Sequence, residues 1–147
     1  MRERESIRAM LGSLVSWYCV DHDIDLLPFG SWTIKRKRIR RSAEPDPCYV
    51  FGVRRTRPRR PDLAIEVIWT SGGIDKLEVW RKLRVPEVWM WRDGGLRVYR
   101  LRGESYRPIP RSQWLPDLDL DLLCRFIDRP TLNQSLREFR AALAARA

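Results

Sequence analysis

The sequence predicts an α/β (α+β) fold in which helices flank one central β-sheet. The predicted elements follow the order helix, strands, helix, strands, helix. Residues 63 to 69 form an almost entirely apolar run, which is typical of a strand covered on both faces. Asp93, Gly94 and Gly95 separate two further β-rich runs and predict a hairpin. With 147 residues, 44% of them hydrophobic, we expect a single domain over residues 1–147.

The first half of the chain predicts a helix, three strands and a second helix. Residues 6 to 18 are expected to be helical because their apolar side chains recur every three or four positions. Residues 31 to 35 and 46 to 51 have the β-branched and aromatic composition of strands. After the apolar strand, Thr70 and Ser71 offer hydroxyls that can cap a helix beginning near Ile74.

The second half predicts the two hairpin strands, over residues 87 to 91 and 96 to 101. Residues 115 to 121, which contain three aspartates, resemble an acidic turn, and residues 132 to 145 predict a terminal helix. No stretch approaches the ~20 consecutive apolar residues of a membrane span, and the start of the chain lacks the apolar part of a secretory signal. We therefore expect a soluble cytoplasmic protein with no membrane partner.

The three cysteines, Cys19, Cys48 and Cys124, do not have the spacing of a zinc site or of a disulfide framework. They fit a reducing interior, where each is expected to act as a small core residue.

The charge of the chain favours a polyanionic partner. A formal net charge of +10 arises from 29 Lys and Arg against 19 Asp and Glu. Nucleic acid is the commonest partner of such a surface, although a basic protein can also simply be soluble. Two segments concentrate the charge and are the predicted nucleic-acid-binding residues: Lys35, Arg36, Lys37, Arg38, Arg40 and Arg41, and then Arg54, Arg55, Arg57, Arg59 and Arg60. Solvated faces without a partner are the alternative for both segments.

Two acidic residues stand out on neighbouring predicted strands. Asp46 begins one strand and Glu66 lies inside the next, so pairing of the strands would bring the carboxylates together. Close carboxylates repel each other, and a bound cation such as Mg²⁺ or Mn²⁺ relieves the repulsion. A salt bridge between Glu66 and an arginine is an equal alternative on these grounds.

Four stretches in a fixed order carry a family resemblance. They are residues 44–46 (Glu-Pro-Asp), 61–67 (Pro-Asp-Leu-Ala-Ile-Glu-Val), 73–77 (Gly-Ile-Asp-Lys-Leu) and 85–89 (Val-Pro-Glu-Val-Trp). Together they resemble the Uma2 family (DUF820) of the PD-(D/E)XK restriction-endonuclease-like superfamily, over roughly residues 5 to 125. The resemblance implies a central mixed β-sheet flanked by helices. It also implies a Mg²⁺- or Mn²⁺-dependent endonuclease that hydrolyses phosphodiester bonds in nucleic acid, with DNA as the expected substrate.

The same resemblance assigns roles to particular residues. Asp46 and Glu66 would hold the metal, together with the backbone carbonyl of Val67. The position of the motif's lysine is occupied by Ile68, and Lys76 in the following helix is the candidate replacement. The carboxylates regarded as auxiliary are Glu44, Asp62 and Asp75.

Two other functions remain open at this point. Because Ile68 occupies the position of the motif's lysine, the sequence is also compatible with a catalytically inactive nucleic-acid-binding module on the same fold. A protein-interaction domain in which the acids are structural is the other alternative. Nucleases of this superfamily often pair so that two sites reach two strands, which makes a homodimer a reasonable arrangement.

Overall fold

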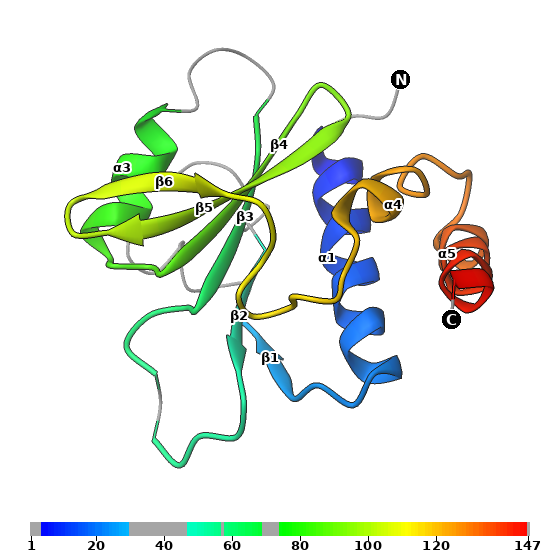
Figure 1. Ribbon diagram of the computed structural model, residues 1–147, viewed down its shortest axis with the longest axis horizontal. Coiled ribbons are helices and arrows are strands. Elements are labelled where there is room, and N and C mark those ends of the chain that lie inside the picture. Colours follow the sequence, from blue (N-terminus) through cyan, green and yellow to red (C-terminus); the bar gives the residue numbers. More distant parts are fainter. Residues whose placement is uncertain (1–3, 30–46, 57, 69–73, 147) are drawn as a thin grey trace.

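The computed structural model describes residues 4–29, 47–56, 58–68 and 74–146. Its centre is a six-stranded sheet with the strand order β1-β2-β3-β4-β5-β6 (Figure 1). The strands are β1 (Leu26–Pro28), β2 (Cys48–Phe51), β3 (Leu63–Val67), β4 (Glu87–Arg92), β5 (Gly95–Arg102) and β6 (Ser105–Ile109). Only β3 and β4 are parallel, and the other neighbours are antiparallel. The sheet is therefore mixed, as the resemblance implies.

Helices cover both faces of this sheet. The parallel strands β3 and β4 are joined by α3 (Ile74–Lys82), because parallel neighbours require a crossover connection. α1 (Arg4–Asp21) lies against the opposite face from α3 (Figure 1). The two short connections at the ends of α3 bring its first turn to the carboxyl end of β3 and its last turn to the start of β4.

The side chains of β3 alternate between two hydrophobic cores. Leu63, Ile65 and Val67 point to the α1 side, where they pack in the larger core. Ala64 points to the α3 side, where its core includes Cys48 and Trp80. A strand buried on both faces has to be apolar at every position, which explains the composition of this run. Glu66 occupies a position of the α3 side.

The second half of the chain agrees with the predicted hairpin but differs in two other elements. Asp119, within the stretch expected to be a turn, caps α4 (Leu120–Cys124) by accepting a 3.0 Å hydrogen bond from the Leu122 amide. β6 was not predicted, because Arg107 and Pro108 interrupt its pattern. Proline is tolerated there because β6 is an edge strand.

The terminal helix, α5 (Leu132–Arg146), matches its prediction and packs beside α1. β1 was also missed, since it is only three residues long and largely exposed. The strand predicted over residues 31 to 35 lies outside the described residues.

Candidate functional site

Glu66 is a buried acid in the middle of the sheet. It is the fourth of five residues in β3, and only 1% of its surface is exposed. The indole Nε1 of Trp80 donates a 2.6 Å hydrogen bond to its Oε1, and Trp80 is itself fully buried. A buried carboxylate is costly unless hydrogen bonds satisfy it. This contact therefore fixes both the position and the orientation of the Glu66 side chain.

The location of Glu66 favours a ligand site. It lies one residue before the carboxyl end of β3, the strand that runs parallel to β4. In α/β proteins, ligands bind in the crevice beyond the carboxyl ends of such strands. The chain returns to this end as α3, whose second and third residues are Asp75 and Lys76. The side chains of Asp75 and Lys76 lie outside the described part of the structure.

The strand β2 pairs with β3 on the side away from β4, and this pairing extends toward Glu66. Cys48 is the register partner of Ala64, and the Ile65 amide donates a 2.9 Å hydrogen bond to the Pro47 carbonyl. The described pairing therefore continues to the residue that follows Asp46 in the sequence. Asp46 and Glu44 themselves lie outside the described residues.

Val67 and Ile68 direct their backbones to opposite neighbours. The Ile68 amide donates a 2.8 Å hydrogen bond to the Trp91 carbonyl in β4. Backbone groups alternate along a strand, so Val67 shares with Ile65 the edge that faces β2. The Ile68 side chain, only 6% exposed, belongs to the core on the α3 side. The position that holds a lysine in the superfamily motif is thus part of the apolar packing here.

Asp62 lies at the other end of β3. Its Oδ2 accepts hydrogen bonds from the Phe51 amide at 2.9 Å and from Nη2 of Arg54 at 2.7 Å. Asp62 and Glu66 are four positions apart, and at about 3.3 Å per residue an extended strand separates them by about 13 Å. Asp62 therefore closes the base of the β2–β3 loop and does not meet Glu66.

The described oxygen donors have the chemistry of a hard-cation site. The Glu66 carboxylate and the Val67 carbonyl are oxygen ligands of the kind that Mg²⁺ and Mn²⁺ accept. No group of three or more His, Cys, Asp or Glu side chains that could hold a metal occurs among the described residues. A complete site at Glu66 would thus require a carboxylate from the residues outside that part of the chain.

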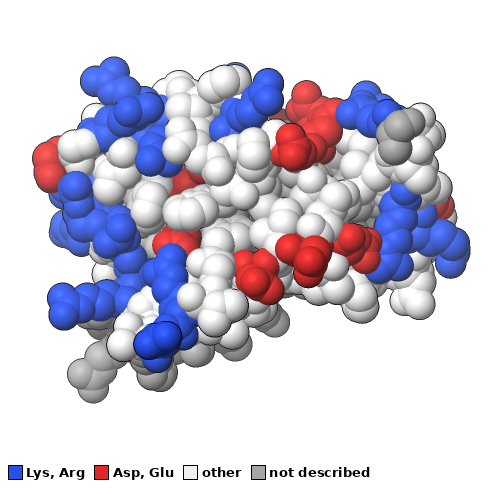
Figure 2. Space-filling view, turned by 60° about the horizontal axis from the view of Figure 1, so that its bottom comes forward, with Lys and Arg blue, Asp and Glu red and all other residues white. Residues whose placement is uncertain are grey.

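The basic β2–β3 loop is close to Glu66 in sequence but lies at the opposite end of β3. Its described arginines, Arg54, Arg55, Arg59 and Arg60, are exposed, whereas Arg57 and the segment from Lys35 to Arg41 lie outside the described residues. Figure 2, which turns the lower end of Figure 1 forward, shows Lys and Arg gathered at the end with α3 and the β5–β6 turn and, in a smaller group, at the opposite end.

Glu87 is a second buried acid, and the sequence patterns did not indicate its structural role. It is fully buried at the start of β4, on the α1 side of the sheet. Its Oε2 accepts a 2.7 Å hydrogen bond from Trp89 Nε1, and its Oε1 accepts a 2.9 Å bond from the Gln113 amide. The signal that pointed to Glu66, an acid in an apolar strand, also applied to Glu87.

A mixed sheet, a β3–α3–β4 crossover and a buried acid near the carboxyl end of β3 define an α/β protein of restriction-endonuclease-like architecture. A comparison with protein families matches residues 2–127 to Uma2, described as "Putative restriction endonuclease". The match spans most of the chain, and the chain therefore belongs to the Uma2 family. Comparisons with curated proteins and with solved structures return no match.

At the level of the family, this membership supports a nuclease role and a nucleic acid substrate. Among the described helices, none is both long enough and apolar enough to cross a membrane.

Proposed function

We propose that this protein is a divalent-metal-dependent endonuclease that hydrolyses phosphodiester bonds in DNA, with Asp46, Glu66 and Lys76 in its active site. The observation that carries the proposal is the burial of Glu66 near the carboxyl end of β3, where Trp80 orients it. A buried, oriented acid at this end of a central strand suits a metal ligand. Membership of a family described as a restriction endonuclease supplies the reaction class.

The register of β2 and β3 supports the participation of Asp46. Cys48 lies opposite Ala64. Asp46 is two residues before Cys48, and Glu66 is two residues after Ala64. If the same register continues, the two acids are opposite each other on the α3 side, with Cα atoms about 5 Å apart. Two carboxylates at that separation favour a cation between them.

We infer that Asp46, Glu66 and the Val67 carbonyl would hold Mg²⁺ or Mn²⁺. Val67 belongs to the same strand edge as Ile65, whose amide bonds to Pro47, so its carbonyl would face the Asp46 side. When bound, the ion would supply charge neutralisation at the scissile phosphate and a more acidic water. Trp80 keeps the Glu66 carboxylate aimed at this position, so that little reorganisation is needed before the reaction.

Lys76 is the proposed cationic partner. It stands four residues before Trp80 in α3, and residues at this spacing share one face of a helix. Since Trp80 contacts Glu66, we infer that the same face carries the Lys76 ammonium toward the site. There it would orient the attacking water and stabilise negative charge that develops on the phosphate.

The auxiliary carboxylates have different expected roles. Asp75, in the first turn of α3, would favour the helix dipole, and Glu44 would support the metal from nearby. Asp62 is assigned to the β2–β3 loop because its hydrogen bonds hold that loop.

A cleavage assay with a parallel binding assay tests the proposal. Supercoiled plasmid and single-stranded DNA are incubated with Mg²⁺, Mn²⁺ or EDTA, using wild type, Asp46→Asn, Glu66→Gln and Lys76→Met. We expect metal-dependent cutting by the wild type alone and DNA binding by all four proteins.

The other outcomes separate the alternatives. Cutting that persists in all three variants would overturn the site assignment. Binding without cutting under any metal would favour an inactive nucleic-acid-binding module, and no binding at all would favour a protein-interaction domain.

A further inference from the structure

The β5–β6 hairpin carries three arginines on one face without acidic partners. Arg107 of β6 is the register partner of Arg100 in β5, and Arg102 lies opposite Ser105. Residues two apart in a strand share a face, so the three guanidinium groups belong to one surface. None of them forms an ion pair within the described part of the chain. By contrast, nearby Arg81 and Arg84 both bind Glu104.

The facing pair Arg100 and Arg107 is unfavourable for the hairpin itself, because like charges directly opposite each other destabilise strand pairing. Glu87 is the neighbour of Arg100 in β4. Its two carboxylate oxygens, however, accept hydrogen bonds from Trp89 and from the Gln113 amide. Hydrogen bonds from these neutral N–H groups do not remove the charge of a carboxylate, so Glu87 can still offset the charge of Arg100. Arg107, in the edge strand, has no acidic register partner among the described residues, which favours an anion from outside the described chain.

These arginines lie at the same end of the sheet as the basic β2–β3 loop. The register runs from Leu63 at the start of β3 through Glu87 and Arg100 to Arg107. Burial raises the pKa of the Tyr106 phenol in β6, while the charges of Arg84, Arg81 and Arg60 act in the opposite direction. Arg60 of the loop is thus electrostatically close to Tyr106, which packs against the core on the α3 side, whereas Arg100, Arg102 and Arg107 lie on the α1 side of the same end of the sheet.

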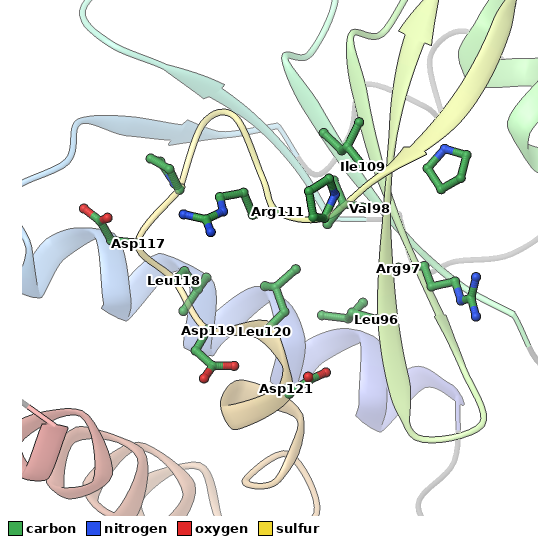
Figure 3. A pocket seen from close by; sticks show the side chains of 13 residues that line it. Leu96, Arg97, Val98, Ile109, Arg111, Asp117, Leu118, Asp119, Leu120 and Asp121 are labelled. Carbon is green, nitrogen blue, oxygen red and sulfur yellow. The ribbon is translucent and has the colours of Figure 1, made fainter.

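Acidic residues appear beside this sheet face toward the start of β5. Next to Leu96 and Val98, a cavity of about 550 Å³ separates β5 and β6 from residues 116 to 121. Figure 3 shows three carboxylates along that segment, from Asp117, Asp119 and Asp121. Arg97 and Arg111 also line this cavity, so its charge is mixed, unlike that of the three hairpin arginines.

We propose that Arg100, Arg102 and Arg107 form a phosphate-binding strip that holds the nucleic acid backbone away from the scissile bond. Strand spacing puts the strip on the order of 17 Å from Glu66 along the sheet. The strip lies on the α1 side and Glu66 on the α3 side, so the strip would contact a part of the nucleic acid that passes around the β6 edge. This inference rests on the proposed function only in taking nucleic acid as the partner. The competing explanation is that Arg107 and Pro108 merely protect the edge strand β6 from pairing with other chains.

Binding measured in EDTA tests the strip without cleavage. Fluorescence anisotropy with a labelled duplex of random sequence gives the affinity over a salt series. The variant is Arg102→Gln/Arg107→Gln, and the control Arg125→Gln/Arg137→Gln removes two exposed arginines near α4 and α5. We expect the strip variant to bind about tenfold more weakly at low salt, with a salt slope lower by about two. The control should keep the wild-type slope.

A second readout separates binding from a structural role. Arg107→Gln removes the facing like charge, so we expect its melting temperature to rise while its affinity falls. If the strip variant and the control variant have equal DNA affinity and equal salt slope, the proposed phosphate-binding strip is overturned. Unchanged binding with new self-association in size-exclusion chromatography would overturn it in favour of edge protection. A wild type that binds no nucleic acid would also overturn it, whereas binding without cutting under any metal would leave the strip standing and remove only the nuclease proposal.

Discussion

Trp80 and Glu66 are joined by a 2.6 Å hydrogen bond from the indole Nε1 to the carboxylate Oε1. Both residues are buried, one in α3 and the other in β3. The bond therefore links the helix that begins at the carboxyl end of β3 to the acid near that end. A change in either residue is expected to affect the other.

Replacing Trp80 should lower both stability and cleavage. Trp80→Phe keeps most of the ring but leaves the buried Glu66 without its indole donor. We expect the free energy of unfolding to fall by about 1–3 kcal/mol, measured by urea denaturation. Trp17→Phe is the control because Trp17 is 42% exposed, and its effect should stay within about 0.5 kcal/mol. Equal effects of the two substitutions would contradict a role for the Trp80 bond.

Glu87 should prove structural. Glu87→Ala would leave the Trp89 indole and the Gln113 amide without their acceptor, and we expect a loss of about 1–3 kcal/mol of stability. Because Glu87 points to the α1 side, away from Glu66, cleavage per folded molecule should remain at the wild-type level. A loss of cleavage in a folded, DNA-binding Glu87→Ala protein would contradict this assignment.

Asp62 should hold the base of the β2–β3 loop. Asp62→Ala leaves the buried Phe51 amide without its carboxylate acceptor, and we expect a loss of about 1–2 kcal/mol together with faster trypsin cleavage in the loop. Arg54→Gln removes the partly exposed ion pair and a long 3.4 Å hydrogen bond to the Phe51 carbonyl, so its effect should remain below about 1 kcal/mol. If the two variants behave alike, the buried amide contact is not what holds the loop.

The thiols of Cys19, which is buried, and Cys124, which is partly buried, should be unreactive near neutral pH. Burial raises the pKa of Cys19 to about 11 and that of Cys124 to about 12, so both are protonated at pH 8 in the folded protein. Iodoacetamide should modify them only after denaturation, as mass spectrometry can measure.

The same shifts have a consequence for stability at alkaline pH. Unfolded thiols ionise near pH 9, whereas the folded thiols retain their protons up to about pH 11 to 12. Their contribution to stability is therefore complete below pH 9 and declines as the pH rises through that window. Rapid modification of Cys19 at pH 8 without denaturant would contradict its burial.

Sequence patterns predicted the elements whose hydrophobic period is long and regular. α1, β3 and the β4–β5 hairpin follow from such periods, and the structure extends α1 to Arg4–Asp21. β6 and α4 were missed because an edge strand and a one-turn helix bury few residues and leave little pattern.

The candidate site was only partly accessible to the same reasoning. An acid in an apolar strand indicated Glu66, but the same signal could not separate it from Glu87, which lies on the other face. The Trp80 bond joins residues fourteen apart, and only the packing of α3 on β3 reveals it. Similarly, Asp62 is close to Glu66 in sequence, yet the extended strand holds them apart.

The most direct test compares two substitutions that each replace one buried carboxylate by its isosteric amide. Glu66→Gln retains an acceptor for Trp80 but loses the charge that a metal requires, whereas Glu87→Gln changes a structural acid. Time courses of plasmid nicking with Mg²⁺ should show a decrease of about 100-fold or more for Glu66→Gln. Glu87→Gln should cut at close to the wild-type rate per folded molecule. Wild-type nicking by a correctly folded Glu66→Gln protein would contradict the proposed active site.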